Sequence, residues 1–184
     1  AGRINQPQTA AAVLHSGQAD MCGMTRALIS DPQMPAKAER GATEDIRACI
    51  ACNQACIGHM LNACSISCIQ HPETGRELEF GILVPTTLKK RIMVAGGGPA
   101  GMSAAYQLRK KGYASTIFEE REQLGGMMRY GIPNYRTPRD ILDAEIKRIL
   151  DLGDIEVVLN TRVGKDVPLE DVEKSHDAVL WTIG

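Results

Sequence analysis

The sequence has few aromatic residues, no excess of charge of one sign and no long apolar run. Aromatic residues make up 4% of the 184 positions, which argues against a protein that stacks single-stranded nucleic acid on aromatic side chains. The 21 Lys and Arg residues are balanced by 22 Asp and Glu, so no basic surface is expected to attract nucleic acid or anionic lipid. No apolar stretch approaches the roughly 20 residues of a membrane helix. The opening AGRINQPQ also lacks the basic and apolar regions of a signal peptide. We therefore expect a soluble, cytoplasmic α/β protein that binds neither nucleic acid nor membrane.

Cysteine, by contrast, is abundant and concentrated in one region. All six cysteines lie between Cys22 and Cys68, and five of them fall within residues 49–68. A disulfide framework would spread its cysteines through the fold, and the rest of the chain has the pattern of a cytosolic α/β protein. A metal centre is therefore the favoured interpretation, and disulfides are the alternative.

The chain divides into four predicted segments. Residues 1–40 alternate helix and strand, with a buried strand expected at 19–24. Residues 41–81 show no sustained hydrophobic period, and a short irregular segment of this kind normally needs a staple, that is, a metal centre or a disulfide that stabilises it. Residues 82–90 are predicted to be a linker. Residues 91–184 show the strand–turn–helix pattern of a Rossmann-like domain, including a helix start at 137–140 that Thr137 is expected to cap.

A glycine-rich loop follows the first strand of that domain. The motif G-x-G-x-x-G consists of Gly96, Gly98 and Gly101, and Glu119 follows 23 positions after Gly96 at the end of the next strand. Gly96 is expected to make the turn, Gly98 to let the backbone approach a pyrophosphate, and Gly101 to permit close helix packing. The helix N-terminus would face the phosphates, and Glu119 would bind an adenosine ribose. A glycine-rich turn without a ligand is the alternative.

The cysteines follow the spacing Cys49-x2-Cys52-x3-Cys56-x11-Cys68. Three closely spaced thiolates and one remote thiolate can surround an iron–sulfur cubane. Tetrahedral zinc takes the same number of thiolates, so a four-cysteine zinc site stays open. Cys64 is the alternative to Cys68 as the fourth ligand, and Cys22 is predicted to be a core residue.

A weaker pattern is the turn from Gly23 through Thr25 to Arg26, between the predicted strand and a helix. Backbone amides and a guanidinium at such a turn would bind a phosphate. Gly2 and Arg3 occupy the corresponding place after the preceding element. A solvated arginine is the alternative, and no residue of the chain stands out as a catalytic acid, base or nucleophile.

The stretches GRINQP, ADMCGMTRALISDPQMPAKA, CIACNQACIG and SCIQHPETGRE resemble the iron–sulfur flavoenzymes of the Old Yellow Enzyme superfamily. That group includes 2,4-dienoyl-CoA reductase, trimethylamine dehydrogenase and N-methylproline demethylase. The resemblance covers about the first 80 residues. It implies the last βα units of an FMN-binding TIM barrel, followed by a [4Fe-4S] segment. It also implies that Gly2, Arg3, Gly23, Thr25 and Arg26 hold the FMN phosphate. The cluster ligands that it implies are Cys49, Cys52, Cys56 and Cys68.

The stretch VAGGGPAGMSAAYQLRKKG is similar to the FAD-binding half of those enzymes, and GGMMRYGIPNYRTPRDI is similar to the glutamate synthase small subunit. This similarity implies nucleotide contacts at a set of residues in the second half of the chain: Gly96, Gly98, Pro99, Ala100, Gly101, Glu119, Arg121, Gly126, Val163 and Thr182. The closing WTIG departs from the usual ATG of the family at Thr182.

The resemblance implies a multi-cofactor oxidoreductase with FAD, FMN and a [4Fe-4S] cluster, in which NAD(P)H is the co-substrate and a small organic molecule is reduced. An amine dehydrogenase or N-demethylase, a non-catalytic electron-transfer subunit and a zinc-stapled nucleotide-binding module are the alternatives. Six barrel units and an NAD(P)H-binding half of the family are not present in the sequence, so we expect an internal piece of a longer enzyme or a subunit of an oligomer. An electron-transfer protein is a further expected partner.

Overall fold

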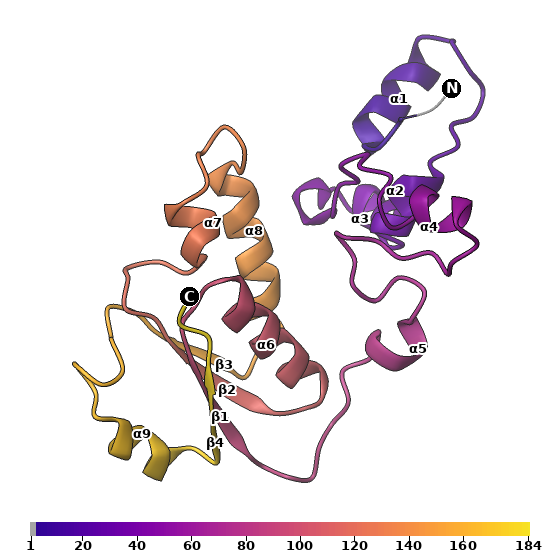
Figure 1. Cartoon of the computed structure of the whole chain (residues 1–184). Coiled ribbons are helices and arrows are strands. Elements are labelled where there is room, and N and C mark those ends of the chain that lie inside the picture. Colours follow the sequence, from indigo (N-terminus) through magenta and orange to yellow (C-terminus); the bar gives the residue numbers. More distant parts are fainter. Residues whose placement is uncertain (1–2) are drawn as a thin grey trace. The chain divides into compact units, whose positions relative to one another are not determined.

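The structure is a computed structural model, and it describes residues 3–184. The chain forms two compact units, with the boundary between Ile82 and Leu83 (Figure 1). Each unit is described separately below.

The first unit consists of short helices joined by irregular segments. Its elements are α1 (Pro7–His15), α2 (Thr25–Ser30), α3 (Met34–Glu39), the 3-10 turn η1 (Thr43–Asp45), α4 (Ile57–Leu61) and α5 (Glu77–Phe80). Ala27, Met34 and Ile46 form a small buried core between α2, α3 and the segment that follows η1. A core of this size buries little apolar area, which agrees with the expectation that the unit needs a further staple.

The buried strand predicted at residues 19–24 is wrong. The segment is irregular, Met21 is 84% exposed and Cys22 is half-buried rather than part of the core. A parallel strand is stable only when its backbone groups pair with neighbouring strands. The described residues 3–82 contain no strand, so this segment has nothing to pair with.

The second unit is built on a four-stranded parallel sheet. Its strands are β1 (Arg91–Ala95), β2 (Ala114–Phe118), β3 (Ile155–Val158) and β4 (Ala178–Trp181), in the order β3-β2-β1-β4. Its helices are α6 (Pro99–Lys110), α7 (Gly126–Tyr130), α8 (Arg139–Leu150) and α9 (Leu169–Ser175). Ile92 pairs with Ser115 of β2 and Ala178 of β4, so β1 lies inside the sheet.

Helices cover both faces of this sheet (Figure 1). Val94 and Ile117 pack with Met102 and Ala105 of α6, and side chains of α8 extend the same cluster. Met93 and Ala95 point to the other face and contact Val172 of α9. The alternation along β1 therefore buries the strand on both sides, as a parallel sheet requires.

Helix α8 begins differently from the prediction. Pro138 occupies the N-cap position and makes no side-chain cap, and Thr137 precedes it. The backbone N–H of Arg139 instead donates to Asn134 Oδ1 at 3.1 Å. The first backbone N–H of the helix is thus satisfied by a residue five positions upstream, which sequence spacing alone does not indicate.

Nearly all of the predicted linker at residues 82–90 belongs to the second unit, which begins at Leu83. The N–H of Val84 donates to Lys110 O at 3.0 Å, beside Gly112, whose φ of +85° ends the turn after α6. The predicted domain boundaries at 40, 81 and 90 stay predictions.

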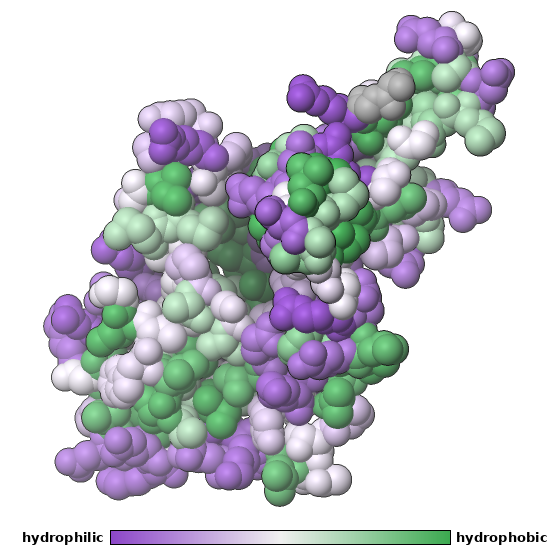
Figure 2. Space-filling model, turned by 45° about the vertical axis from the view of Figure 1, so that its right-hand side comes forward, coloured by the Kyte–Doolittle hydropathy of each residue, from purple (hydrophilic) through white to green (hydrophobic). Residues whose placement is uncertain are grey.

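The visible face of the molecule mixes apolar and polar patches (Figure 2). Among residues 3–184, no helix combines the length and the apolar character that a membrane crossing needs.

Candidate functional site

The cysteines singled out by their spacing lie around one small cavity in the first unit. Cys49, Cys52, Cys56 and Cys68 all line it, and each is half-buried. Cys64 is exposed and does not line the cavity. The structure therefore brings the predicted four together and leaves the alternative fourth ligand outside.

The four sulfur atoms do not converge on a single metal position. Within the described residues, no group of three or more Cys, His, Asp or Glu side chains is placed to share a single metal ion. Tetrahedral zinc with Zn–S bonds of about 2.3 Å needs its four sulfurs within about 4 Å of one another. In a cubane cluster each thiolate binds a different iron, so the four sulfur atoms lie farther apart. Four thiolates around one cavity are a donor set that either centre takes, so the choice between them stays a prediction.

The backbone of the cysteine loop is held in an unusual conformation. Ala51 and Asn53 have φ values of +55° and +58°, on either side of Cys52. The turn at Ala51 directs its N–H toward Cys49 Sγ at an N···S distance of 3.4 Å. Amide donors to sulfur stabilise thiolate charge and are among the features that set the potential of iron–sulfur centres.

Arg26 also reaches this loop. It lies in the first turn of α2 and lines the cysteine cavity, and its Nη1 donates to Asn53 Oδ1. The sequence predicted Arg26 as a phosphate ligand, and no pattern in the sequence indicated Asn53. The bond uses one of the five N–H donors of the guanidinium.

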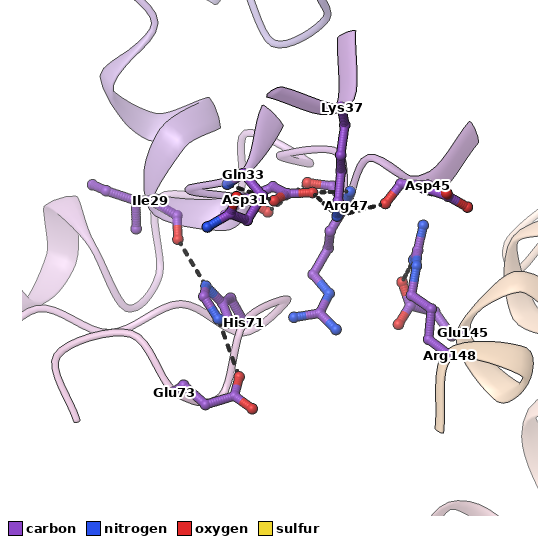
Figure 3. Close-up of polar contacts among 11 residues, drawn as sticks. Ile29, Asp31, Gln33, Lys37, Asp45, Arg47, His71, Glu73, Glu145 and Arg148 are labelled. Carbon is purple, nitrogen blue, oxygen red and sulfur yellow. Dashed lines mark hydrogen bonds and ion pairs between the residues drawn. The ribbon is translucent and has the colours of Figure 1, made fainter. Parts of the chain in front are cut away.

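Asp31 ties α3 to the segment that leads into the cysteines (Figure 3). Its carboxylate accepts bonds from Lys37 Nζ at 2.7 Å, from the N–H of Arg47 at 2.9 Å and from the N–H of Gln33 at 3.0 Å. Burial raises the pKa of Asp31. These bonds and the charge of Lys37 together lower the pKa by more than burial raises it, so it lies below its ordinary 3.8.

His71 fastens the segment after Cys68 to α2. Its Nε2 lies 3.1 Å from a Glu73 carboxylate oxygen and its Nδ1 lies 3.3 Å from Ile29 O (Figure 3). Ile29 O also accepts the Thr74 hydroxyl at 3.0 Å. Ile29 itself lines the cysteine cavity. Two sets of polar contacts therefore fix both ends of the cysteine segment to α2 and α3.

The predicted FMN-phosphate residues are less well gathered. Gly2 lies outside the described residues, while Arg3, Gly23 and Thr25 are exposed. Arg3 has a φ of +67°. Of this set, Arg26 alone takes part in a tertiary hydrogen bond that the structure describes.

The glycine loop of the second unit connects β1 to α6. Gly96 has a φ of +107°, and a Cβ there would lie 2.6 Å from Thr182 O. At Gly101, on the first turn of α6, a Cβ would lie 1.9 Å from Gly96 O, so only glycine lets the helix approach the strand this closely. At Gly98 the nearest atom to such a Cβ is Gly126 Cα at 3.7 Å, which is ordinary contact. The backbone at Gly98 is therefore open to an approaching ligand.

Glu119 is bound to this loop. Its carboxylate is buried, with the residue 5% exposed, and accepts the N–H of Gly97 at 2.7 Å and that of Arg121 at 3.0 Å. A carboxylate with two oxygens offers about four acceptor positions, so both bonds leave capacity for a ligand hydroxyl. Glu119 thus holds the loop in shape in addition to the ribose contact predicted for it.

The other predicted nucleotide residues surround the same loop. Thr182 Oγ1 donates toward Ala95 O at 2.8 Å and Gly96 O at 2.9 Å. The Arg121 guanidinium lies over the Tyr130 ring, 4.5 Å from its centroid. The positions of the rest are as follows: Pro99 and Ala100 are exposed on the first turn of α6, Gly126 starts α7 beside Gly98, and Val163 forms an isolated bridge with Val167.

The sequence argument missed Gly97 and Gly125. Gly97 is buried between Leu124 and Glu119, and Gly125, with a φ of +117°, donates its N–H to Gly97 O at 2.9 Å. The pair Gly125–Gly126 was a visible signal for this second turn.

Comparison with known proteins agrees with the geometry. The family of NAD(P)-binding Rossmann-like domains matches residues 94–144. A metal reductase of Desulforamulus reducens is 44% identical over 126 residues, which are 68% of this chain and 19% of that protein. The cinnamate reductase of Clostridium sporogenes is 33% identical over 90% of this chain and 25% of its own length. The glutamate synthase [NADPH] small chain of Bacillus subtilis is 34% identical over 66% of this chain and 25% of its own length.

Two solved structures match almost the whole chain. Histamine dehydrogenase from Rhizobium sp. 4-9 is 30% identical, with a TM-score of 0.75 over 100% of this chain and 27% of that one. A 2-naphthoyl-CoA reductase is 31% identical, with a TM-score of 0.72 over 99% of this chain and 27% of that one. The chain spans about a fifth to a quarter of the length of the curated relatives above.

These matches define the class first: the chain has an α/β fold, its residues 94–144 match NAD(P)-binding Rossmann-like domains, and the relatives it resembles are named reductases and dehydrogenases. The predicted fold class is confirmed. Within that class, the resemblance to the iron–sulfur flavoenzymes of the Old Yellow Enzyme superfamily and to the glutamate synthase small chain is confirmed as well.

Proposed function

We propose that the chain belongs to a flavin and iron–sulfur oxidoreductase in which a [4Fe-4S] cluster on Cys49, Cys52, Cys56 and Cys68 carries electrons between FAD and FMN, with NAD(P)H as co-substrate. The observation that carries this proposal is the common cavity of the four cysteines. When bound, the flavins and the cluster supply the redox chemistry, and the residues of the chain bind them and set their surroundings.

The cysteine segment supports a cluster because it is held as a rigid frame. Asp31 accepts the Arg47 N–H just before the first ligand, and His71 contacts Ile29 O just after the last. Partly buried thiolates on a fixed frame hold a cluster away from water, which protects it and sets its potential.

The second unit supports FAD as its nucleotide. The N-terminus of α6 presents backbone N–H groups and a positive dipole end at Gly98, where the loop leaves room for a pyrophosphate. Glu119 lies at the end of β2, where it has acceptor capacity for ribose hydroxyls. We propose contacts to FAD at the predicted residues around this loop, Pro99, Ala100, Arg121, Gly126, Val163 and Thr182 included.

We propose enoyl-type reduction of a small organic substrate, because cinnamate reductase and 2-naphthoyl-CoA reductase match 90% and 99% of the chain. A second candidate is oxidation of an amine. Histamine dehydrogenase has the higher TM-score of the two structures, and an N,N-dimethylglycine/sarcosine dehydrogenase of Chromohalobacter salexigens is 37% identical over 70% of the chain. The remaining partners, an electron-transfer protein and further copies or subunits, belong to this proposal as well.

The experiment compares Cys68→Ser with Cys64→Ser in anaerobically purified protein. Cys68→Ser is expected to lose most of its iron, sulfide and visible absorbance, because a cubane needs its fourth thiolate. Cys64→Ser is the matched control and should keep the wild-type iron content, because Cys64 lies outside the cavity. Equal iron loss in both variants, or zinc in place of iron in the wild type, would contradict the proposal.

A further inference from the structure

We propose that Arg26 is a positioning residue for the cluster site: it fixes the loop between Cys52 and Cys56 through Asn53, and its charge raises the reduction potential of the cluster. This inference rests on the proposed function. It goes beyond it because Arg26 was expected to serve a flavin phosphate and not the cysteines.

First, Arg26 lies on a helix that two of its residues hold in place. Arg26 is the second residue of α2, and the next residue, Ala27, is buried in the core of the first unit. Ser30 at the other end of α2 donates its hydroxyl to Arg47 O at 3.0 Å. The helix therefore presents the guanidinium from a fixed position.

The second step is the loop that it holds. Asn53 is in the left-handed conformation, and it is anchored on two sides: its side-chain oxygen accepts from Arg26, and its backbone oxygen accepts the N–H of Gly58 at 2.8 Å. Asparagine tolerates this conformation better than most residues. Because Cys52 and Cys56 flank this doubly anchored residue, the two bonds determine how both thiolates face the cavity.

The third step is electrostatic. Among the described residues that line the cavity, Arg26 alone is cationic. Reduction adds negative charge to a cluster that is already anionic with its four thiolates. A half-buried guanidinium on the cavity wall stabilises the reduced form more than the oxidised form, so its removal should lower the potential.

The experiment is an anaerobic redox titration of the reconstituted full chain, followed by the electron paramagnetic resonance signal of the reduced cluster. Arg26→Met removes the charge and the bond, Arg26→Lys keeps the charge, and Asn53→Gly keeps the backbone conformation without the acceptor. Arg40→Met removes an exposed charge that does not line the cavity and is the matched control.

We expect Arg26→Met to lower the equilibrium constant for one-electron reduction of the cluster about tenfold, which corresponds to a fall of 59 mV in its reduction potential. Arg26→Lys should restore most of the lost potential, and Arg40→Met should have a potential near the wild-type value. Asn53→Gly should lower the potential as well and broaden the electron paramagnetic resonance signal. Combining Arg26→Met with Asn53→Gly should add little, because the two residues act through one bond.

Two results would overturn the inference. If wild-type protein holds iron and sulfide but Arg26→Met and Arg40→Met have the same potential, Arg26 does not act on the cluster while the proposed function stands. If the wild type holds neither iron nor sulfide after reconstitution, the proposed function fails and this inference fails with it.

Discussion

Two glycines of one loop, three residues apart, should respond in opposite ways to the same added methyl group. In Gly101→Ala the new Cβ would lie 1.9 Å from Gly96 O, just after β1, and 2.9 Å from Thr182 Oγ1, just after β4. Relief needs a shift of about 1.5 Å between helix and strand, and overpacking of this kind costs roughly 3 kcal/mol. The helix propensity of alanine returns about 1 kcal/mol, so the net loss is about 2 kcal/mol.

In Gly98→Ala the Cβ meets its nearest atom at 3.7 Å, and φ is −75°, a value that alanine adopts freely. The fold should lose less than about 1 kcal/mol, mainly from the weaker N-cap. The methyl group would instead occupy the space proposed for the pyrophosphate. We therefore expect Gly98→Ala to fold and to bind FAD at least tenfold more weakly.

The assay can report on the second unit alone. Trp181 in β4 is the single tryptophan of the chain, so its fluorescence follows unfolding of that unit. A net loss of about 2 kcal/mol predicts a fall in Tm of about 10 °C for Gly101→Ala. FAD affinity is measured by quenching of flavin fluorescence. Equal Tm values for the two variants, or unchanged FAD binding by Gly98→Ala, would refute the packing argument.

Three further predictions concern single polar or backbone features. The pKa of Asp31 is held below 3.8, so its stabilising effect is present above that pH and is lost as the pH falls through the lowered value. Acid titration of helical circular dichroism should show this loss, and Asp31→Asn should weaken the pH dependence at a cost of about 2 kcal/mol. Glu119→Gln should destabilise the second unit by roughly 2 kcal/mol and weaken FAD binding, because two charge-assisted bonds to backbone N–H groups become neutral. Trp181 fluorescence measures the stability and flavin titration the affinity. A stable variant with full FAD affinity would contradict the role of Glu119. Ala51→Gly should stabilise the first unit against urea by up to about 1 kcal/mol, because the left-handed conformation costs alanine more than glycine, and a destabilised variant would show that the conformation is not strained.

The second unit could be predicted closely from its sequence because local signals agree there with the tertiary structure. Residues 92–95 form a continuous apolar run, and the glycine motif follows it directly, so strand, turn and helix each have a signal of their own. The strand β1 was predicted with its observed bounds, and the close approach at Gly101 follows from the motif. The start of α8 was less predictable, because its first N–H is satisfied by Asn134 through a turn and not by an adjacent cap.

The first unit shows where local signals fail. The segment 19–24 has the apolar composition of a strand, but a strand forms only with partners, and its own unit supplies none among the described residues. The four thiols singled out by their spacing line one cavity, and their role as cluster ligands stays a prediction. Nothing in the spacing indicated how the cysteine segment is held. The contact between Arg26 and Asn53 joins residues 27 positions apart, and left-handed turns at Ala51 and Asn53 carry no glycine signal.

The proposed function depends above all on an iron–sulfur cluster held by the four cysteines of the first unit. The most direct test is an anaerobic absorption spectrum of the purified chain, with iron, sulfide, zinc and flavin assayed on the same sample. We expect broad absorbance near about 400 nm that dithionite bleaches, with roughly four iron and four sulfide per chain and FAD bound. A colourless protein with one zinc per chain and no sulfide would contradict it.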